Sequence, residues 1–157
     1  MASEERNFKV DCTKDPKEPF FHFVPSERLA DFLVHDGEAR EVFPVEGHLD
    51  TKEVLLASIA KALIFPDYFG GNWDALDESI KDLSWLPAQR FVLLVKNGDD
   101  LLKLPRKDWD ILFGVFSEAV EFWQDEGTPF HLVLAGGEAL SQRLKALVEK
   151  PICFHYT

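Results

Sequence analysis

The hydrophobic positions of this 157-residue chain alternate between short apolar runs and stripes with helical spacing. Four short runs are typical of β-strands, at 20–24, 41–45, 90–95 and 130–134. The third run is almost uninterrupted, as expected of a strand that is covered on both faces. Pro44 lacks a backbone N–H, so it restricts the second run to a sheet edge or a bulge.

Between these runs lie segments with apolar positions three and four residues apart, or with the caps that begin helices. The predicted helices are a segment capped by Ser26 and ended by Gly37, a helix over 51–63 opened by a capping box of Asp50 and Glu53, a helix from the cap Asn72 to Leu83, and helices over 108–125 and 138–149.

Strands separated by helices predict an α/β fold, with a small three- to four-stranded, mainly parallel sheet and helices packed on it. The length predicts a single domain over 1–157. Within it we expect a flexible lead-in over 1–19, an N-terminal extension over 20–40, and a C-terminal helix and tail over 138–157.

Composition narrows the class of protein. Hydrophobic residues make up 46% of the chain, which excludes wholesale disorder. Lys and Arg total 17 against 28 Asp and Glu, so the formal net charge is -11. This charge disfavours direct binding of nucleic acid and favours a positively charged partner.

The expected cellular location is inferred from the lack of targeting and membrane-spanning segments in the sequence. The N-terminal residues show no signal peptide, and no apolar run approaches the roughly 20 residues that cross a bilayer. Cys12 and Cys153 do not form a dense disulfide framework. We therefore expect a cytoplasmic protein with two reduced thiols and no membrane contact.

The most informative stretch runs from Tyr68 to Glu78, where a glycine loop leads into a short helix. Asp74, Glu78 and Asp82 recur every four residues, so they share one helix face, with Asp77 beside them. The flanking aromatic residues are Tyr68, Phe69, Trp73 and Trp85. Carboxylates framed by aromatic rings favour a surface that binds a basic partner over a merely solvated acidic face.

Catalysis is not indicated, and we predict no catalytic residue, cofactor or metal ligand. Exposed carboxylates four residues apart lack the difference in solvation that an acid–base pair needs. Gly70 and Gly71 are not followed by the Lys of a phosphate loop, and 135–137 is an ordinary strand-to-helix turn. The five histidines are scattered, and His131 is interpreted as a core histidine.

This stretch resembles the signature segment of the barstar family of ribonuclease inhibitors. The resemblance rests on a proline, an aromatic pair, Gly-x-Asn, an aromatic residue, Asp-Ala-Leu and an acidic residue. In this chain these are Pro66, Tyr68, Phe69, Gly70, Asn72, Trp73, Asp74, Ala75, Leu76 and Glu78. The order of flanking strands and helices also agrees, so the resemblance covers about 41–137.

The resemblance implies that the loop and helix plug the active site of a ribonuclease. By position, Glu78 and Asp74 would mimic RNA phosphates, and Tyr68 would cap the site. Asn72 and Gly70 would supply backbone and amide contacts. The implied partner-binding residues are Tyr68, Phe69, Gly70, Asn72, Trp73, Asp74, Asp77, Glu78 and Glu118, the last as a supporting carboxylate.

The sequence departs from the best-known member at three positions of this surface. It has Glu78 in place of Asp, Asp77 in place of Trp and Lys81 in place of Thr. These differences point to a cognate target other than barnase. The sequence thus predicts an antitoxin or immunity protein that is monomeric when free and inhibits a basic secreted ribonuclease in a 1:1 complex. The alternative is a module with the same fold that binds another basic protein.

Overall fold

The computed structural model describes residues 21–36, 42–87, 90–147 and 152–155. The lead-in predicted over 1–19 lies outside these residues. In chain order the elements are β1 (Phe21–Pro25), the 3-10 helix η1 (Ser26–Arg28), α2 (Leu29–Asp36), β2 (Val42–Val45), α3 (Lys52–Ala62), α4 (Trp73–Ile80), β3 (Phe91–Val95), the 3-10 helix η3 (Gly98–Lys103), α5 (Arg106–Asp125), β4 (Phe130–Gly136), α6 (Glu138–Lys145) and β5 (Ile152–Phe154).

The strands form one five-stranded sheet in the order β2-β3-β4-β1-β5, and every neighbouring pair is parallel. The predicted α/β fold with a parallel sheet is confirmed, although β5 brings the strand number above the three or four expected. Strand β1 pairs with β4, so the strand predicted near the N-terminus does lengthen the sheet. Strand β2 lies at an edge, and Pro44 is exposed there, as its missing N–H requires.

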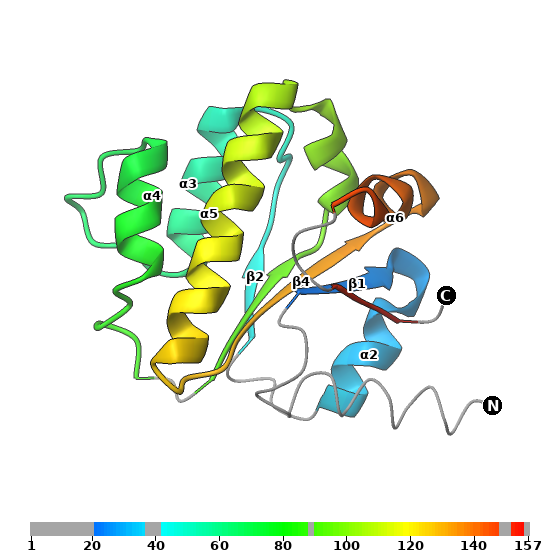
Figure 1. Cartoon of the computed structure of the whole chain (residues 1–157), viewed down its shortest axis with the longest axis horizontal. Helices are drawn as coiled ribbons and strands as arrows, with labels where there is room; N and C mark the ends of the chain where they lie inside the picture. Colours follow the sequence, from blue (N-terminus) through cyan, green and yellow to red (C-terminus); the bar gives the residue numbers. More distant parts are fainter. Residues whose placement is uncertain (1–20, 37–41, 88–89, 148–151, 156–157) are drawn as a thin grey trace.

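Helices cover both faces of the sheet (Figure 1). The larger hydrophobic core is formed by helices α3, α4, α5 and α6 and by alternate residues of strands β1 to β4. Ile152 and Phe154 of β5 are only partly buried and pack against this core. On the opposite face, Phe32 of α2 packs with a smaller cluster of strand residues. Strand β3 is buried at every position, which confirms the two-sided cover predicted from its sequence. Among the described residues, no helix is both long and apolar enough to cross a bilayer.

Two predicted helix caps are wrong. Helix α3 is capped by Thr51, whose Oγ1 accepts a hydrogen bond from the N–H of Val54 at 3.3 Å, and not by Asp50. Ser26 lies inside η1 rather than capping α2. Both errors have one cause: neighbouring polar residues can satisfy the same free N–H groups, so sequence locates a helix start only to within a residue or two.

The turn between β4 and α6 is filled by a carboxylate of the protein itself. Asp99 Oδ1 accepts a hydrogen bond from the N–H of Gly137 at 2.9 Å, at the start of α6. A Cβ on Gly136 would lie 2.7 Å from the same oxygen, so a larger residue there would displace the Asp99 carboxylate. Because Asp99 occupies the position in which an anion would bind a helix N-terminus, the turn is structural, as predicted.

Two expectations about the remaining side chains need correction. His22, His131 and His155 are not scattered, because hydrogen bonds join them in a buried row. Cys153 takes part in a disulfide, so the reduced thiol expected at this position is wrong, whereas Cys12 lies outside the described residues. The prediction that His131 belongs to the core is confirmed.

Candidate functional site

The loop between α3 and α4 is held to the core by aromatic rings. The ring of Phe65 lies edge-on to that of Phe69, with centroids 4.9 Å apart, and edge-on to that of Trp85 at 5.9 Å. Trp85 Nε1 donates a hydrogen bond to the carbonyl oxygen of Leu63 at 2.9 Å. The neighbouring Tyr68 is 79% exposed. The loop thus presents an exposed ring from a fixed backbone.

The two glycines that follow leave the backbone open to solvent. Gly71 has a φ of +71°, a conformation that favours glycine, and no atom lies within 4 Å of the Cβ that another residue would carry. Asn72 then caps α4, because its Oδ1 accepts a hydrogen bond from the N–H of Ala75 at 2.7 Å. The cap predicted from sequence is confirmed.

Helix α4 has a buried face and an acidic face. Leu76 and Ile80 are fully buried in the core, while Asp74 and Glu78 are exposed. Trp123 Nε1 of α5 donates a hydrogen bond to the carbonyl oxygen of Ile80 at 2.8 Å, which anchors the end of α4. The carboxylates are therefore displayed from a short helix whose other side is fixed.

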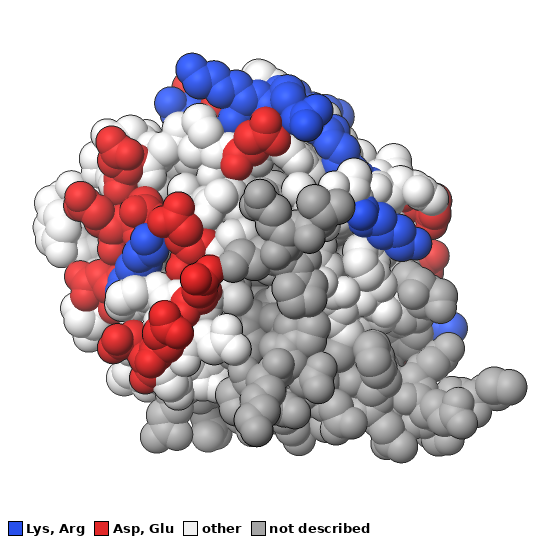
Figure 2. Space-filling model, in the orientation of Figure 1, with Lys and Arg blue, Asp and Glu red and all other residues white. Residues whose placement is uncertain are grey.

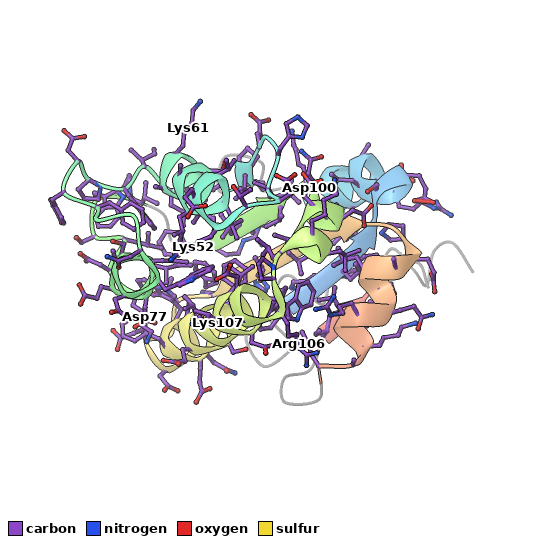
Figure 3. All side chains as sticks on the ribbon, turned by 90° about the horizontal axis from the view of Figure 1, so that it is seen from above. Lys52, Lys61, Asp77, Asp100, Arg106 and Lys107 are labelled. Atoms are coloured by element: carbon purple, nitrogen blue, oxygen red, sulfur yellow. The ribbon has the colours of Figure 1, made fainter. Side chains whose placement is uncertain are left out.

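At the start of α4, Trp73 is half-buried and lies beside a cation. The Nζ of Lys52, on α3, is 6.0 Å from the centroid of the Trp73 ring. Figure 3 shows Lys52 between α3 and α4. This contact links the start of α4 to α3.

Lys81 joins α4 to α5 through two ion pairs. Its Nζ lies 3.1 Å from Asp77 Oδ1 and 3.2 Å from Glu118 Oε1. Burial alone lowers the pKa of Lys81, but hydrogen bonds to Asp77 and Glu118 and their negative charges outweigh it, so its pKa is raised. Lys81 stays charged, and the three side chains carry a net charge of -1.

The charges of the molecule are separated in space. Figure 2 shows acidic side chains gathered over the side where α4 and α5 lie, with basic atoms among them. Basic side chains gather instead at the top of the same view, near the start of α5, where Figure 3 labels Arg106 and Lys107. We call the loop 66–72, α4, Lys81, Asp82 and Glu118 the loop–helix surface.

The structure brings the candidate residues of the sequence together on this surface, with differing exposure. Tyr68, Gly70, Asn72, Asp74, Glu78 and Glu118 are exposed, whereas Phe69, Trp73 and Asp77 are half-buried. Sequence reasoning missed Ile64, which is 63% exposed and has a φ of 55°, a rare conformation for a β-branched residue. It also missed that Glu118 is held by Lys81, since the two are 37 positions apart.

The arrangement is suited to binding. Asp74 and Glu78 are both exposed to solvent, so neither is desolvated relative to the other, as an acid–base pair would require. Exposed carboxylates on a fixed helix can instead form charge-assisted hydrogen bonds with guanidinium or ammonium groups of a partner. The surface is therefore suited to binding a basic partner.

Comparison with known families identifies the family to which this protein belongs. A family model described as Barstar (barnase inhibitor) matches residues 42–135, which is more than half of the chain, so the protein belongs to the Barstar family. The family consists of inhibitors rather than enzymes. The match includes β2 to β4 and the loop–helix surface, and leaves β1 and β5 outside. No protein with a curated description matches the chain.

A solved structure shares the fold. The structure of the Aeropyrum pernix ORC1 protein in complex with DNA aligns with 99% of this chain at a TM-score of 0.57 and 19% sequence identity. The alignment covers 45% of the ORC1 chain. At this identity the likeness concerns the fold alone.

Proposed function

We propose that this protein is a stoichiometric, non-catalytic inhibitor of a basic ribonuclease. The loop–helix surface would enter the active site of the enzyme, with Asp74 and Glu78 in the positions of RNA phosphates. The observation that carries this proposal is the pair of exposed carboxylates on α4, whose end is anchored to α5, together with the exposed ring of Tyr68 in the preceding loop. Membership of a family described as barnase inhibitors supports it.

The contacts of each side chain suggest its part in the complex. The Asn72 Oδ1 is occupied by the helix cap, so this residue would offer its Nδ2 amide and its backbone to the enzyme. The backbone at Gly70 and Gly71 is exposed and open to close approach. Tyr68 would cover the mouth of the active site, and Glu118 would support the carboxylates from α5.

The expected partner is a secreted enzyme, from which the producing cell must be protected while the enzyme is inside it. The protein would then act in the cytoplasm as an antitoxin or immunity protein, as a monomer that forms a 1:1 complex. Its formal net charge of -11 would accelerate the encounter with a basic enzyme.

The test is a titration of purified protein against a panel of small basic microbial ribonucleases, with RNA cleavage as the readout. We expect activity of one member to fall linearly and reach zero at one equivalent of inhibitor. Glu27→Ala serves as a matched control, because Glu27 is an exposed carboxylate next to α2, far along the chain from the loop–helix surface. Absence of inhibition for every member would contradict the proposal.

One observation favours a second candidate, a binding module of the same fold for a basic protein that is not a ribonuclease. Lys81 places a retained positive charge within the loop–helix surface, next to Asp77. Such a charge selects against some basic partners and in favour of others. This second function would be identified by a basic protein that binds the loop–helix surface but does not cleave RNA.

A further inference from the structure

A buried cluster of histidines and a cysteine lies on the sheet face opposite the larger core. In the parallel register of β1 and β5, His22 stands directly beside Cys153. His155 follows β5, and its N–H donates a hydrogen bond to the carbonyl oxygen of Phe23 at 2.9 Å. The backbone of two paired strands therefore fixes the positions of three side chains that can all bind metals.

The ring nitrogens of this cluster are close together. His22 Nδ1 lies 3.1 Å from His155 Nε2, and His22 Nε2 lies 2.9 Å from His131 Nδ1 on β4. One ligand atom each of His22, Cys153 and His155 lies within 4.8 Å of the other two. The three histidines are 0% exposed and Cys153 is 4% exposed.

The spacing of these three ligand atoms is near that of three corners of a tetrahedral metal site. Two imidazole nitrogens bound to one zinc ion at 2.0–2.1 Å are about 3.3–3.4 Å apart, close to the 3.1 Å separation of His22 and His155. In a zinc site a thiolate sulfur would lie about 3.6 Å from each nitrogen. Cys153 Sγ lies within 4.8 Å of both ring nitrogens, so it would need to move toward them by roughly 1 Å at most.

We infer that His22, Cys153 and His155 form a site for a thiophilic divalent metal ion of the Zn²⁺ class in the reduced protein. Thiolate and imidazole are the ligands that zinc prefers. His131 would act as the outer partner: His22 coordinates through Nδ1 and donates its Nε2–H to His131 Nδ1, which fixes the tautomer of the ligand. This site lies apart from the loop–helix surface and does not depend on the proposed inhibition.

The protonation state of His22 suits this role. Burial is the main reason that its pKa lies well below the ordinary value, with smaller contributions from His131 and His155. The imidazole is thus neutral at pH 7 and has a lone pair to donate. Burying the polar rings of these histidines costs free energy of folding, a cost that aliphatic side chains such as the neighbouring Val24 and Val133 would not have in the same space.

Metal binding and the disulfide of Cys153 exclude each other, because a disulfide sulfur is a poor ligand. A reductant of the dithiol class would supply two electrons and two protons to the disulfide and would itself become a disulfide. The metal ion then replaces the proton on the Cys153 thiol. The cluster thus has two states, a disulfide form and a metal-bound form.

The test uses the full-length protein, reduced with a phosphine and titrated with Co²⁺ as a spectroscopic substitute for zinc. We expect one equivalent to bind with a sulfur-to-cobalt charge-transfer band and the strong visible bands of tetrahedral cobalt. Zn²⁺ should abolish both. At free zinc about 100-fold above the dissociation constant, we expect the melting temperature to rise by roughly 5–10 °C.

Controls separate this site from adventitious binding. The first control is the oxidised wild-type protein, in which Cys153 is held in the disulfide. With Co²⁺ it should lack the sulfur-to-cobalt charge-transfer band. Cys153→Ser and His155→Asn should each weaken Co²⁺ binding by at least tenfold, whereas His48→Ala, at an exposed histidine, should leave it unchanged. The inference is overturned if the reduced protein gives no tetrahedral cobalt spectrum, or if both site variants bind as tightly as wild type.

Discussion

Lys81 decides how much of the negative charge on the loop–helix surface is available to a partner. Its ammonium group neutralises one charge of the pair formed by Asp77 and Glu118, and it remains only 25% exposed. Asp74 and Glu78 have no ion-pair partner among the described residues. We therefore expect these two carboxylates, rather than Asp77 and Glu118, to provide most of the electrostatic contribution to binding.

Replacing this lysine tests its structural part. Lys81→Met should lower the free energy of unfolding at pH 7 by at most about 1 kcal/mol, because the partners are partly exposed. Since the folded-state pKa is raised from 10.5, the stabilisation is fully present below pH 10.5 and is lost as pH rises through the folded-state pKa. Urea unfolding of both proteins across this range measures the difference. A difference that persists unchanged at the highest pH would contradict the ion-pair account.

Tyr68 allows binding to be separated from stability. With its side chain 79% exposed, Tyr68→Ala should change the free energy of unfolding by less than about 0.5 kcal/mol. If the ring covers the active site of a ribonuclease, the same substitution should weaken the complex by at least tenfold. Thermal unfolding and a binding titration of one preparation provide both values. Equal binding by wild type and variant would remove Tyr68 from the interface.

At the scale of elements, the start of α4 is the feature on which the surface depends most. The Asn72 cap satisfies a free N–H, and the conformation of Gly71 sets the direction of the loop. Asn72→Ala should lower the free energy of unfolding by about 1 kcal/mol, while Asn72→Asp, which retains an acceptor, should lose much less. Equal losses in the two variants, measured by urea unfolding, would show that the cap is not the cause.

Elements with strong local signals were predicted correctly from sequence. Asn72 stands directly before an apolar stripe, and Pro44 can be accommodated only at an edge or a bulge, so both placements follow from one or two residues. The caps of α2 and α3 were wrong because Ser26, Asp50 and Thr51 are all chemically able to cap. Strand β5 was missed because three residues are too few to show a period.

At the scale of the whole molecule, the features that sequence did not reveal are contacts between distant positions. His22 meets His131 and His155 across 109 and 133 residues, and nothing in the local pattern of any strand indicates the pairing. The ion pair between Lys81 and Glu118 likewise depends on α4 lying beside α5. For the histidines, the order of strands in the sheet places the side chains together.

The overall charge should control how fast the complex forms. We expect the association rate with a basic ribonuclease to fall steeply as ionic strength rises, and Glu78→Ala to lower both the rate and its salt dependence. Stopped-flow mixing at several salt concentrations measures this. An association rate of the wild-type protein that does not depend on salt would exclude electrostatic steering by this surface.

Asp74 and Glu78 are the groups that we propose to block a ribonuclease. The most direct measurement compares inhibition constants of wild type, Asp74→Ala, Glu78→Ala and the control Glu27→Ala against the enzyme found in the titration. We expect a loss of at least 100-fold, on the order of 3 kcal/mol, for each carboxylate of the surface, and no change for Glu27→Ala. Inhibition of equal strength by all four proteins would show that these carboxylates do not block the enzyme.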